Sequence, residues 1–296
     1  MNRRELMKRV FAATAAVSIP SLLRGQATQL AVLDGGGANV IALSTGDGLI
    51  LVDSGAPRSG DALLAALKAF APNAKVKTLF NTHYHLDQTG NNETIAAGGA
   101  KIIAHERTKQ WMSTDYWMPD QDRYEKARPK AAWPTETFMT TGSMKVGAET
   151  IDYGYLTLAH TSGDIYVYFK DANVLAVGDV VSPVRDPALD YFTGAWIGGR
   201  VDAMDLLLKL SNDRTRIIPA YGPAMTKAEL QAERDVMEEV RVRLFNQIRE
   251  GKGPMDMLES GLMKGLARTW KDPYKFLYDA AKGLWAHHNK IDPNVV

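Results

Sequence analysis

The chain has 296 residues, of which 45% are hydrophobic and 23% are charged, and its formal net charge at pH 7 is +1. These values are typical of a folded protein with a sizeable core, made of one large domain or two small ones. No cluster of basic side chains lies beyond the first 25 residues, which excludes the positive surface that nucleic acid binding requires. The chain contains no cysteine, so any metal site must use nitrogen and oxygen ligands.

The N-terminal segment resembles a signal peptide. Arg3 and Arg4 lie in a basic stretch, an apolar stretch follows, and small residues end the segment at Ala27. The paired arginines resemble a twin-arginine export signal, with an ordinary amphipathic helix as the alternative. The apolar stretch is short for a bilayer span, so we expect residues 1–27 to be removed and leave no stable membrane anchor. We expect residues 28–296 to form a single exported domain, periplasmic or extracellular, that acts on a small molecule.

The remaining sequence alternates between strand and helix patterns. Three short β-rich runs come first, at residues 30–35, 39–45 and 48–55. Two helix patterns follow, at residues 59–71 and 92–99, and each precedes a strand pattern, at residues 76–80 and 101–105. Residues 107–150 are rich in Trp, Tyr and Pro without a regular pattern, and predict a long functional loop or lid. Strands resume and helices end the chain, at residues 151–160, 164–169, 173–181, 201–211, 215–222 and 226–251. Strands followed by helices, occurring twice, fit two packed sheets covered outside by helices.

Histidines and aspartates gather where three of these strands end. His83, His85 and Asp87 follow the strand at residues 76–80, and an extended backbone projects residues two apart to the same side. His160 and Asp179 each end a later strand, and strand ends are where a rigid scaffold presents polar groups to a shared site. Two histidines alone are often a structural or surface feature. The added carboxylates and third histidine favour a metal site.

These residues resemble the signatures of the metallo-β-lactamase superfamily. Residues 83–90 resemble its His-x-His-x-Asp-His motif, residues 159–164 its third histidine, residues 176–181 its bridging aspartate and residues 217–230 its closing segment. The resemblance implies an α/β fold, a four-layer αβ/βα sandwich with the site at the mouth between the sheets. It also implies that Asp53 supports the metal-ligand loop; a turn residue with only local hydrogen bonds is the alternative.

The resemblance implies that a first metal ion is bound by residues that are all present, namely His83, His85, His160 and Asp179. Three neutral imidazoles leave most of the charge of a zinc ion to a bound water, whose pKa can then approach about 7. The histidine-rich set favours one zinc ion as the cofactor. Iron, which relatives in the superfamily use, is the alternative.

Two positions depart from the family pattern at the second metal site. Gln88 stands in place of the third clustered histidine, and Tyr221 in place of the final one. An amide is a weak ligand for zinc, and a phenol with a reference pKa of about 10 must lose its proton to bind well. Although Asp87 and Asp179 remain, we expect the second site to be empty or weakly filled.

The sequence therefore predicts a metal-dependent hydrolase in which metal-bound hydroxide attacks an ester, lactone, amide or similar bond. In a one-metal site Asp87 can orient or deprotonate the attacking water, while Tyr221 and Gln88 can donate hydrogen bonds to an oxyanion. Substrate binding alone, or a site without turnover, are the alternatives for these residues. A non-catalytic ligand-binding protein of this fold and a mononuclear iron oxidoreductase are the competing functions.

The other histidines and the aromatic segments carry weaker predictions. His105 is expected to be structural or to support the site from outside it. His287 and His288 are expected to interact with a helix dipole near the end of a C-terminal helix, with a place at the pocket rim for one of them as the alternative. The aromatic side chains of residues 111–133 and 190–199 either line a substrate pocket or attach loops to the core. The sequence lacks a nucleophilic serine elbow, a phosphate-binding glycine loop and a dinucleotide fingerprint.

Overall fold

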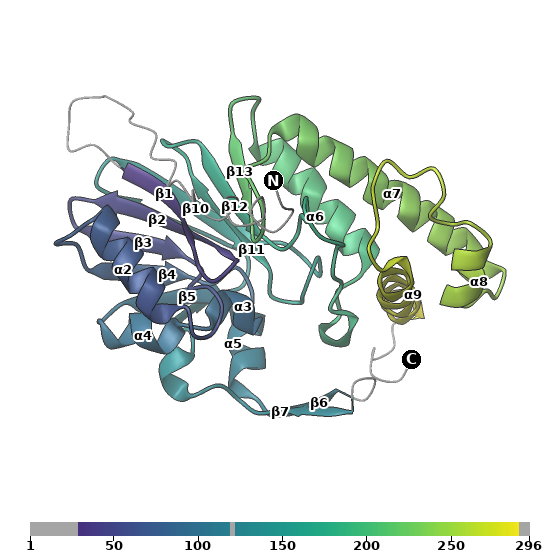
Figure 1. Ribbon diagram of the computed structural model, residues 1–296, viewed down its shortest axis with the longest axis horizontal. Coiled ribbons are helices and arrows are strands. Elements are labelled where there is room, and N and C mark those ends of the chain that lie inside the picture. The colour runs from purple at the N-terminus through teal and green to yellow at the C-terminus, as the bar shows by residue number, and fades with distance from the viewer. Residues whose placement is uncertain (1–28, 119–121, 290–296) are drawn as a thin grey trace, which may run out of the picture.

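The computed structural model describes residues 29–118 and 122–289. The predicted export segment, residues 1–27, lies outside these ranges, so export stays a prediction. Two β-sheets pack face to face and carry helices on their outer faces, which confirms the four-layer αβ/βα sandwich (Figure 1). Within the described ranges, no helix is both long enough and apolar enough to cross a membrane.

The first sheet has the order β1-β2-β3-β4-β5-β8. Its strands are β1 (Gln29–Asp34), β2 (Asn39–Thr45), β3 (Gly48–Val52), β4 (Val76–Phe80), β5 (Lys101–His105) and β8 (Glu136–Phe138). Strands β1 to β3 form an antiparallel meander, and β3, β4, β5 and β8 run parallel. Helices α2 (Gly60–Phe70) and α4 (Asn92–Ala97) cover the outer face because Leu63, Leu67 and Ile95 pack on it.

The second sheet has the order β13-β12-β11-β10-β9. Its strands are β9 (Thr141–Val146), β10 (Glu149–Tyr155), β11 (Ile165–Phe169), β12 (Val174–Gly178) and β13 (Arg216–Pro219). Four helices on its other side are α6 (Ile197–Leu210), α7 (Lys227–Arg249), α8 (Pro254–Glu259) and α9 (Pro273–Asn289). The long α7 begins at a capping box between Thr226 and Glu229, which satisfies its first free N–H groups.

The core between the sheets explains the sequence pattern of the central strands. Strands β3, β11 and β12 are buried along their whole length, because layers cover both of their faces. A strand buried on both sides reads as a continuous apolar run, as in residues 174–178. Phe80, Val167 and Phe169 fill the space between the sheets and are 0% exposed. The packed sheets hold the strand ends rigidly where the polar residues follow.

The prediction of an irregular segment at residues 107–150 was wrong. The described part of this segment forms short elements instead, namely α5 (Glu106–Ser113), β6 (Tyr116–Met118), β7 (Arg123–Glu125), η2 (Lys130–Ala132), β8 and β9. Strands β6 and β7 form a separate antiparallel pair at the bottom of Figure 1. Strands β8 and β9 are sheet edges, where exposed side chains are polar, so their sequences lack the apolar run of a central strand.

Candidate metal centre

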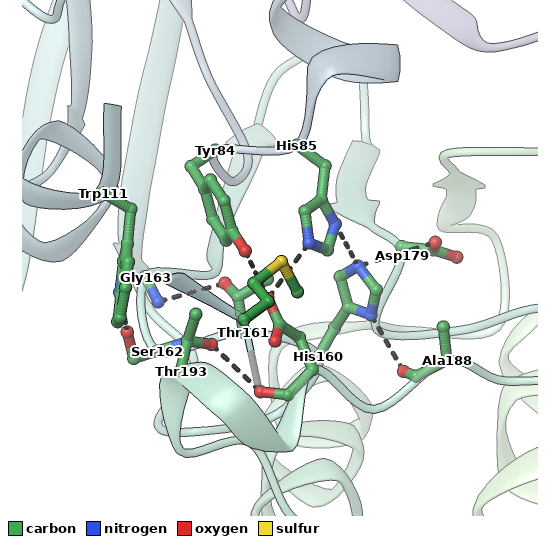
Figure 2. A network of polar contacts seen from close by, with 12 residues as sticks. Tyr84, His85, Trp111, His160, Thr161, Ser162, Gly163, Asp179, Ala188 and Thr193 are labelled. Atoms are coloured by element: carbon green, nitrogen blue, oxygen red, sulfur yellow. Dashed lines mark hydrogen bonds and ion pairs between the residues drawn. The ribbon is translucent and has the colours of Figure 1, made fainter. Parts of the chain in front are cut away.

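Three histidines meet at the edge where the strands end. His83 and His85 lie between β4 and the short helix α3 (Leu86–Thr89), and His160 lies in the loop after β10. One ring nitrogen of each lies within 4.8 Å of the others. Nδ1 of His85 is 3.0 Å from Nε2 of His160, and Figure 2 shows these rings facing each other. Nε2 of His83 is buried without a hydrogen-bond partner among the described residues.

The second nitrogen of each ring is held by a neighbouring polar group. The partners are Oγ1 of Thr82 at 3.1 Å for His83, Oδ2 of Asp190 at 3.1 Å for His85, and the carbonyl oxygen of Ala188 at 2.8 Å for His160. A carbonyl or a carboxylate can only accept, so the rings of His85 and His160 must donate an N–H to these partners. Their other nitrogens then present lone pairs toward each other, as metal binding requires.

Asp53 determines which nitrogen of His83 carries the proton. Its carboxylate accepts both the N–H and the O–H of Thr82, each at 2.7 Å. When Asp53 is ionised, this bond uses the only hydroxyl proton of Thr82, so the Thr82 oxygen accepts Nδ1–H from His83 and the lone pair stays on Nε2. Asp53 is 3% exposed with a φ of 62°, and burial raises its pKa to about 8. Asp53 thus acts on the histidine group through Thr82.

The charge states of the histidines differ. Burial lowers the pKa of His83 well below 6.5, and the neighbouring imidazoles lower it further, so this ring is neutral. Burial also lowers the pKa of His85, but the hydrogen bond and charge of Asp190 raise it more, so the net shift is upward. Burial opposes ionisation of Asp190, and His85 nevertheless brings its pKa below the ordinary value. Without a metal, Asp190 therefore favours the protonated form of His85.

The donor set fits a zinc ion. Zinc takes histidine nitrogens at about 2.0–2.1 Å in tetrahedral sites, which separates neighbouring ligand nitrogens by roughly 3.3 Å. The His85–His160 separation of 3.0 Å is close to this value. The unpartnered Nε2 of His83 supports the same conclusion, because buried polar atoms without partners are rare and costly.

Asp179 lies beside the histidines, and an arginine binds it. Oδ2 of Asp179 is 3.7 Å from Nε2 of His160, and Figure 2 shows it next to this ring. The same oxygen accepts a hydrogen bond from the guanidinium of Arg185, while Oδ1 accepts one from Oγ of Ser182 at 3.2 Å. The histidine group that can hold a metal does not include Asp179 within the described residues. Its role as a ligand stays a prediction.

Asp87, Gln88 and Tyr221 form the neighbouring part of the site. The hydroxyl of Tyr221 donates to Oδ2 of Asp87. Burial raises the pKa of Tyr221 above its ordinary value of 10, and the bond to Asp87 raises it further, so the phenol is a neutral donor. Gln88 is 0% exposed, and neither atom of its amide has a partner in the described structure. The predicted roles of these three residues stay predictions.

Comparison with known proteins identifies the family. The sequence profile of the Metallo-beta-lactamase superfamily matches residues 33–222. The chain belongs to the metallo-β-lactamase superfamily. It is 23% identical over 217 residues to the 2,4-dinitroanisole O-demethylase subunit alpha of Nocardioides sp. (strain JS1661), across 71% of this chain and 60% of that protein, which is less than two thirds of its length.

Two further relatives support the same fold. A metallo-beta-lactamase type 2 from Bacillus sp. (strain 170) is 22% identical over 201 residues, which cover 68% of this chain and 73% of that protein. Among solved structures, the stereoselective inverting sec-alkylsulfatase Pisa1 from Pseudomonas sp. superposes with a TM-score of 0.63 at 15% identity. That likeness covers 88% of this chain and 49% of the sulfatase, and it concerns the fold alone.

Two residues of this superfamily member were missed from the sequence. Asp190 lies 105 positions from His85, in an aromatic segment that predicted at most a pocket wall. Arg185 lies in the loop after β12, and its guanidinium stacks 3.5 Å from the centre of the Tyr221 ring. A single residue in a loop has no periodic sequence pattern, so the contacts of Asp190 with His85 and of Arg185 with Tyr221 become visible only in the folded structure.

The remaining histidines lie outside the metal group. His105 is buried, its Nε2 is 3.0 Å from the carbonyl oxygen of Met139, and its ring stacks on Tyr155 at 4.0 Å. Its Nδ1 accepts the N–H of Arg107 and so caps α5. His287, in the last turn of α9, stacks on Trp196 with ring centres 3.7 Å apart. These contacts are sufficient to explain His105 and His287 as structural residues.

A cavity of about 390 Å³ opens against the histidines of this superfamily site. His85 and His160 form part of its wall, and aromatic side chains line it, among them Tyr84, Tyr116 and Phe192. Its size is within the range of small-molecule sites. The aromatic segments of the sequence therefore contribute to a pocket beside the metal group.

Proposed function

We propose that this protein is a metal-dependent hydrolase that uses one zinc ion bound by His83, His85 and His160. Membership of the superfamily supports metal-dependent hydrolysis as the general reaction. The observation that carries the proposal is the convergence of three nitrogens within 4.8 Å, each on a ring whose other nitrogen is already hydrogen-bonded. A zinc ion held by these three histidines would supply Lewis acidity, which would polarise a carbonyl or similar group and lower the pKa of a bound water.

Residues beside the histidines supply the proton chemistry. Asp87 is the proton acceptor for the attacking water, and the hydroxyl of Tyr221 holds its carboxylate in position. One oxygen of Asp87 accepts this bond, which leaves the other oxygen available to accept a proton. The amide of Gln88 has unused donors and acceptors, which suits it to hydrogen-bond the substrate.

The pocket suggests the kind of substrate. Arg128 lines the cavity at intermediate exposure, and its guanidinium has no hydrogen-bond or ion-pair partner among the described residues. Arg123 on the same wall is neutralised by Glu125 at 2.7 Å. We therefore propose a small aromatic or apolar substrate that carries an anionic group, which binds Arg128. The distance between this anionic group and the scissile bond must allow the scissile bond to lie at the histidines.

Two further aspects of the proposal concern the metal and the location. Zinc is favoured over iron because the group offers three imidazoles, whereas iron sites that activate oxygen more often combine two histidines with a carboxylate. Export to the periplasm or the outside of the cell is proposed from the twin-arginine-like segment at residues 1–27. The domain then meets small molecules rather than nucleic acids.

Hydrolysis assays test the proposed function. The zinc-loaded protein and a His160→Ala variant are assayed on aryl esters, lactones, β-lactams, alkyl sulfates and an aryl methyl ether, each with and without a carboxylate. The proposal predicts hydrolysis of at least one anionic aromatic substrate by the wild type and its loss in the variant. Tight ligand binding without turnover on any substrate would favour a binding protein, and oxygen consumption by an iron-loaded sample would favour an oxidoreductase.

A further inference from the structure

The guanidinium of Arg185 lies in the middle of the residues that stand at the second metal position. It donates to Asp179, stacks 3.5 Å from the centre of the Tyr221 ring, and interacts electrostatically with Asp87. Asp179 is 3% exposed, and a buried carboxylate is costly unless a cation pairs with it. Arg185 supplies this cation from within the chain.

The two departures from the family pattern suit a guanidinium better than a metal ion. A tyrosine ring at position 221 offers a flat face for stacking, which favours arginine through cation–π interaction. The two carboxylates of the site, Asp87 and Asp179, are the groups that both a metal and an arginine bind. An uncharged amide at Gln88 leaves the region without a third strong metal ligand.

The loop that carries Arg185 is held rigidly. Arg268 donates to the carbonyl oxygens of Ser182 and of Arg185 itself. Arg200, which is 0% exposed, donates to Oγ of Ser182 at 2.9 Å and to the carbonyl oxygen of Ala188 at 3.2 Å. With its backbone held on both sides, Arg185 reaches Asp179 from a fixed point and is not a loosely placed surface side chain.

We propose that Arg185 is the resident cation of the second metal position, so that its guanidinium excludes a second metal ion even when metal ligands are available there. The proposal rests on the one-metal centre described above and explains why that centre holds a single ion. Arg185 is a positioning residue: it occupies Asp179 and prevents this carboxylate from binding a metal. Restoring the two missing histidines alone is then insufficient to create a two-metal site.

Metal stoichiometry tests this proposal independently of activity. The wild type, a Gln88→His/Tyr221→His double variant, and the same double variant with Arg185→Ala are loaded with zinc, dialysed and analysed by inductively coupled plasma mass spectrometry. We expect one zinc per chain in the first two proteins and two in the triple variant. Two ions in the double variant, or one ion in a folded triple variant, would overturn the proposal.

Single substitutions keep the test decisive if the triple variant does not fold. Arg185→Ala releases Asp179 and removes a positive charge beside the ion, so we expect its single zinc to bind about tenfold more tightly. Arg185→Lys retains the charge and is expected to bind zinc like the wild type. Equal affinities in all three proteins refute the role of Arg185. Absence of zinc from the wild type would instead refute the proposed function. Even then, one more ion in the triple variant than in the double variant would support the exclusion of a metal ion by Arg185.

Discussion

The contact between Asp190 and His85 predicts how zinc binding depends on pH. Zinc binds neutral imidazole, so a proton on His85 competes with the metal. Asp190 raises the pKa of His85 above 6.5, against the opposite effect of burial. Below that pKa, each further unit of pH weakens the apparent zinc affinity about tenfold, or about 1.4 kcal/mol. We expect the affinity of the wild type to fall as the pH drops through the raised pKa of His85, and to keep falling below pH 6.5.

Replacing Asp190 with asparagine changes both the affinity and its pH dependence. At about pH 8 the variant loses the carboxylate that orients His85 and increases its basicity, a change that typically costs 10- to 100-fold in metal affinity. Toward about pH 6 the difference in zinc affinity between the two proteins shrinks. Without Asp190 to raise the pKa of His85, protons compete less with zinc in the variant. In the metal-free wild type, the raised pKa of His85 gives stability that is complete below the unfolded pKa of about 6.5 and is lost as the pH rises through the higher folded pKa. Asp190→Asn lacks this stability.

Competition with a chelator at the two pH values measures these effects. The matched control is Asp47→Asn, which removes a carboxylate from the exposed turn between β2 and β3 and leaves the metal group unchanged. The control should follow the wild type at both pH values. If Asp190→Asn binds zinc with the affinity and pH dependence of the control, the assignment of Asp190 as the partner of His85 is refuted.

Three further substitutions test separate parts of the structure. Thr82→Val removes the hydroxyl that joins Asp53 to the histidines, so urea denaturation should show a loss of about 1–3 kcal/mol in the free energy of unfolding, with Thr82→Ser near the wild type. Arg128→Ala should raise KM for an anionic substrate about tenfold and leave its neutral analogue unchanged; equal effects on both would contradict the pocket assignment. Arg200→Leu should cost about 1–3 kcal/mol of unfolding free energy, because it removes a fully buried cation that donates to Ser182 and Ala188; no measurable loss would contradict this.

The sequence was sufficient to predict the layers and the histidine group. Strands such as β12 are short apolar runs, and a polar residue directly after a strand, such as Asp179, must appear at the sheet edge. His83, His85 and His160 were therefore predictable as neighbours, and the structure brings them together. Periodicity is informative here because burial on both faces determines which residues the strands contain.

The loop contacts could not be predicted in the same way. Arg185 and Asp190 lie in the segment between β12 and α6, which has no periodic pattern, and their partners are positioned by tertiary packing. The edge strand β9 was missed because its burial alternates between exposed and intermediate, so it lacks an apolar run. Local sequence carries little information about residues whose conformation depends on contacts far along the chain.

Zinc content is the most direct test of the metal centre. The purified protein, His83→Ala, His160→Ala and the control His287→Ala are dialysed against a zinc buffer and analysed by mass spectrometry, with circular dichroism to verify folding. The control residue stacks on Trp196, outside the metal group. We expect one zinc per chain in the wild type and the control, and none in the other two variants. Zinc retained by folded His83→Ala and His160→Ala, or absent from the wild type, would contradict it.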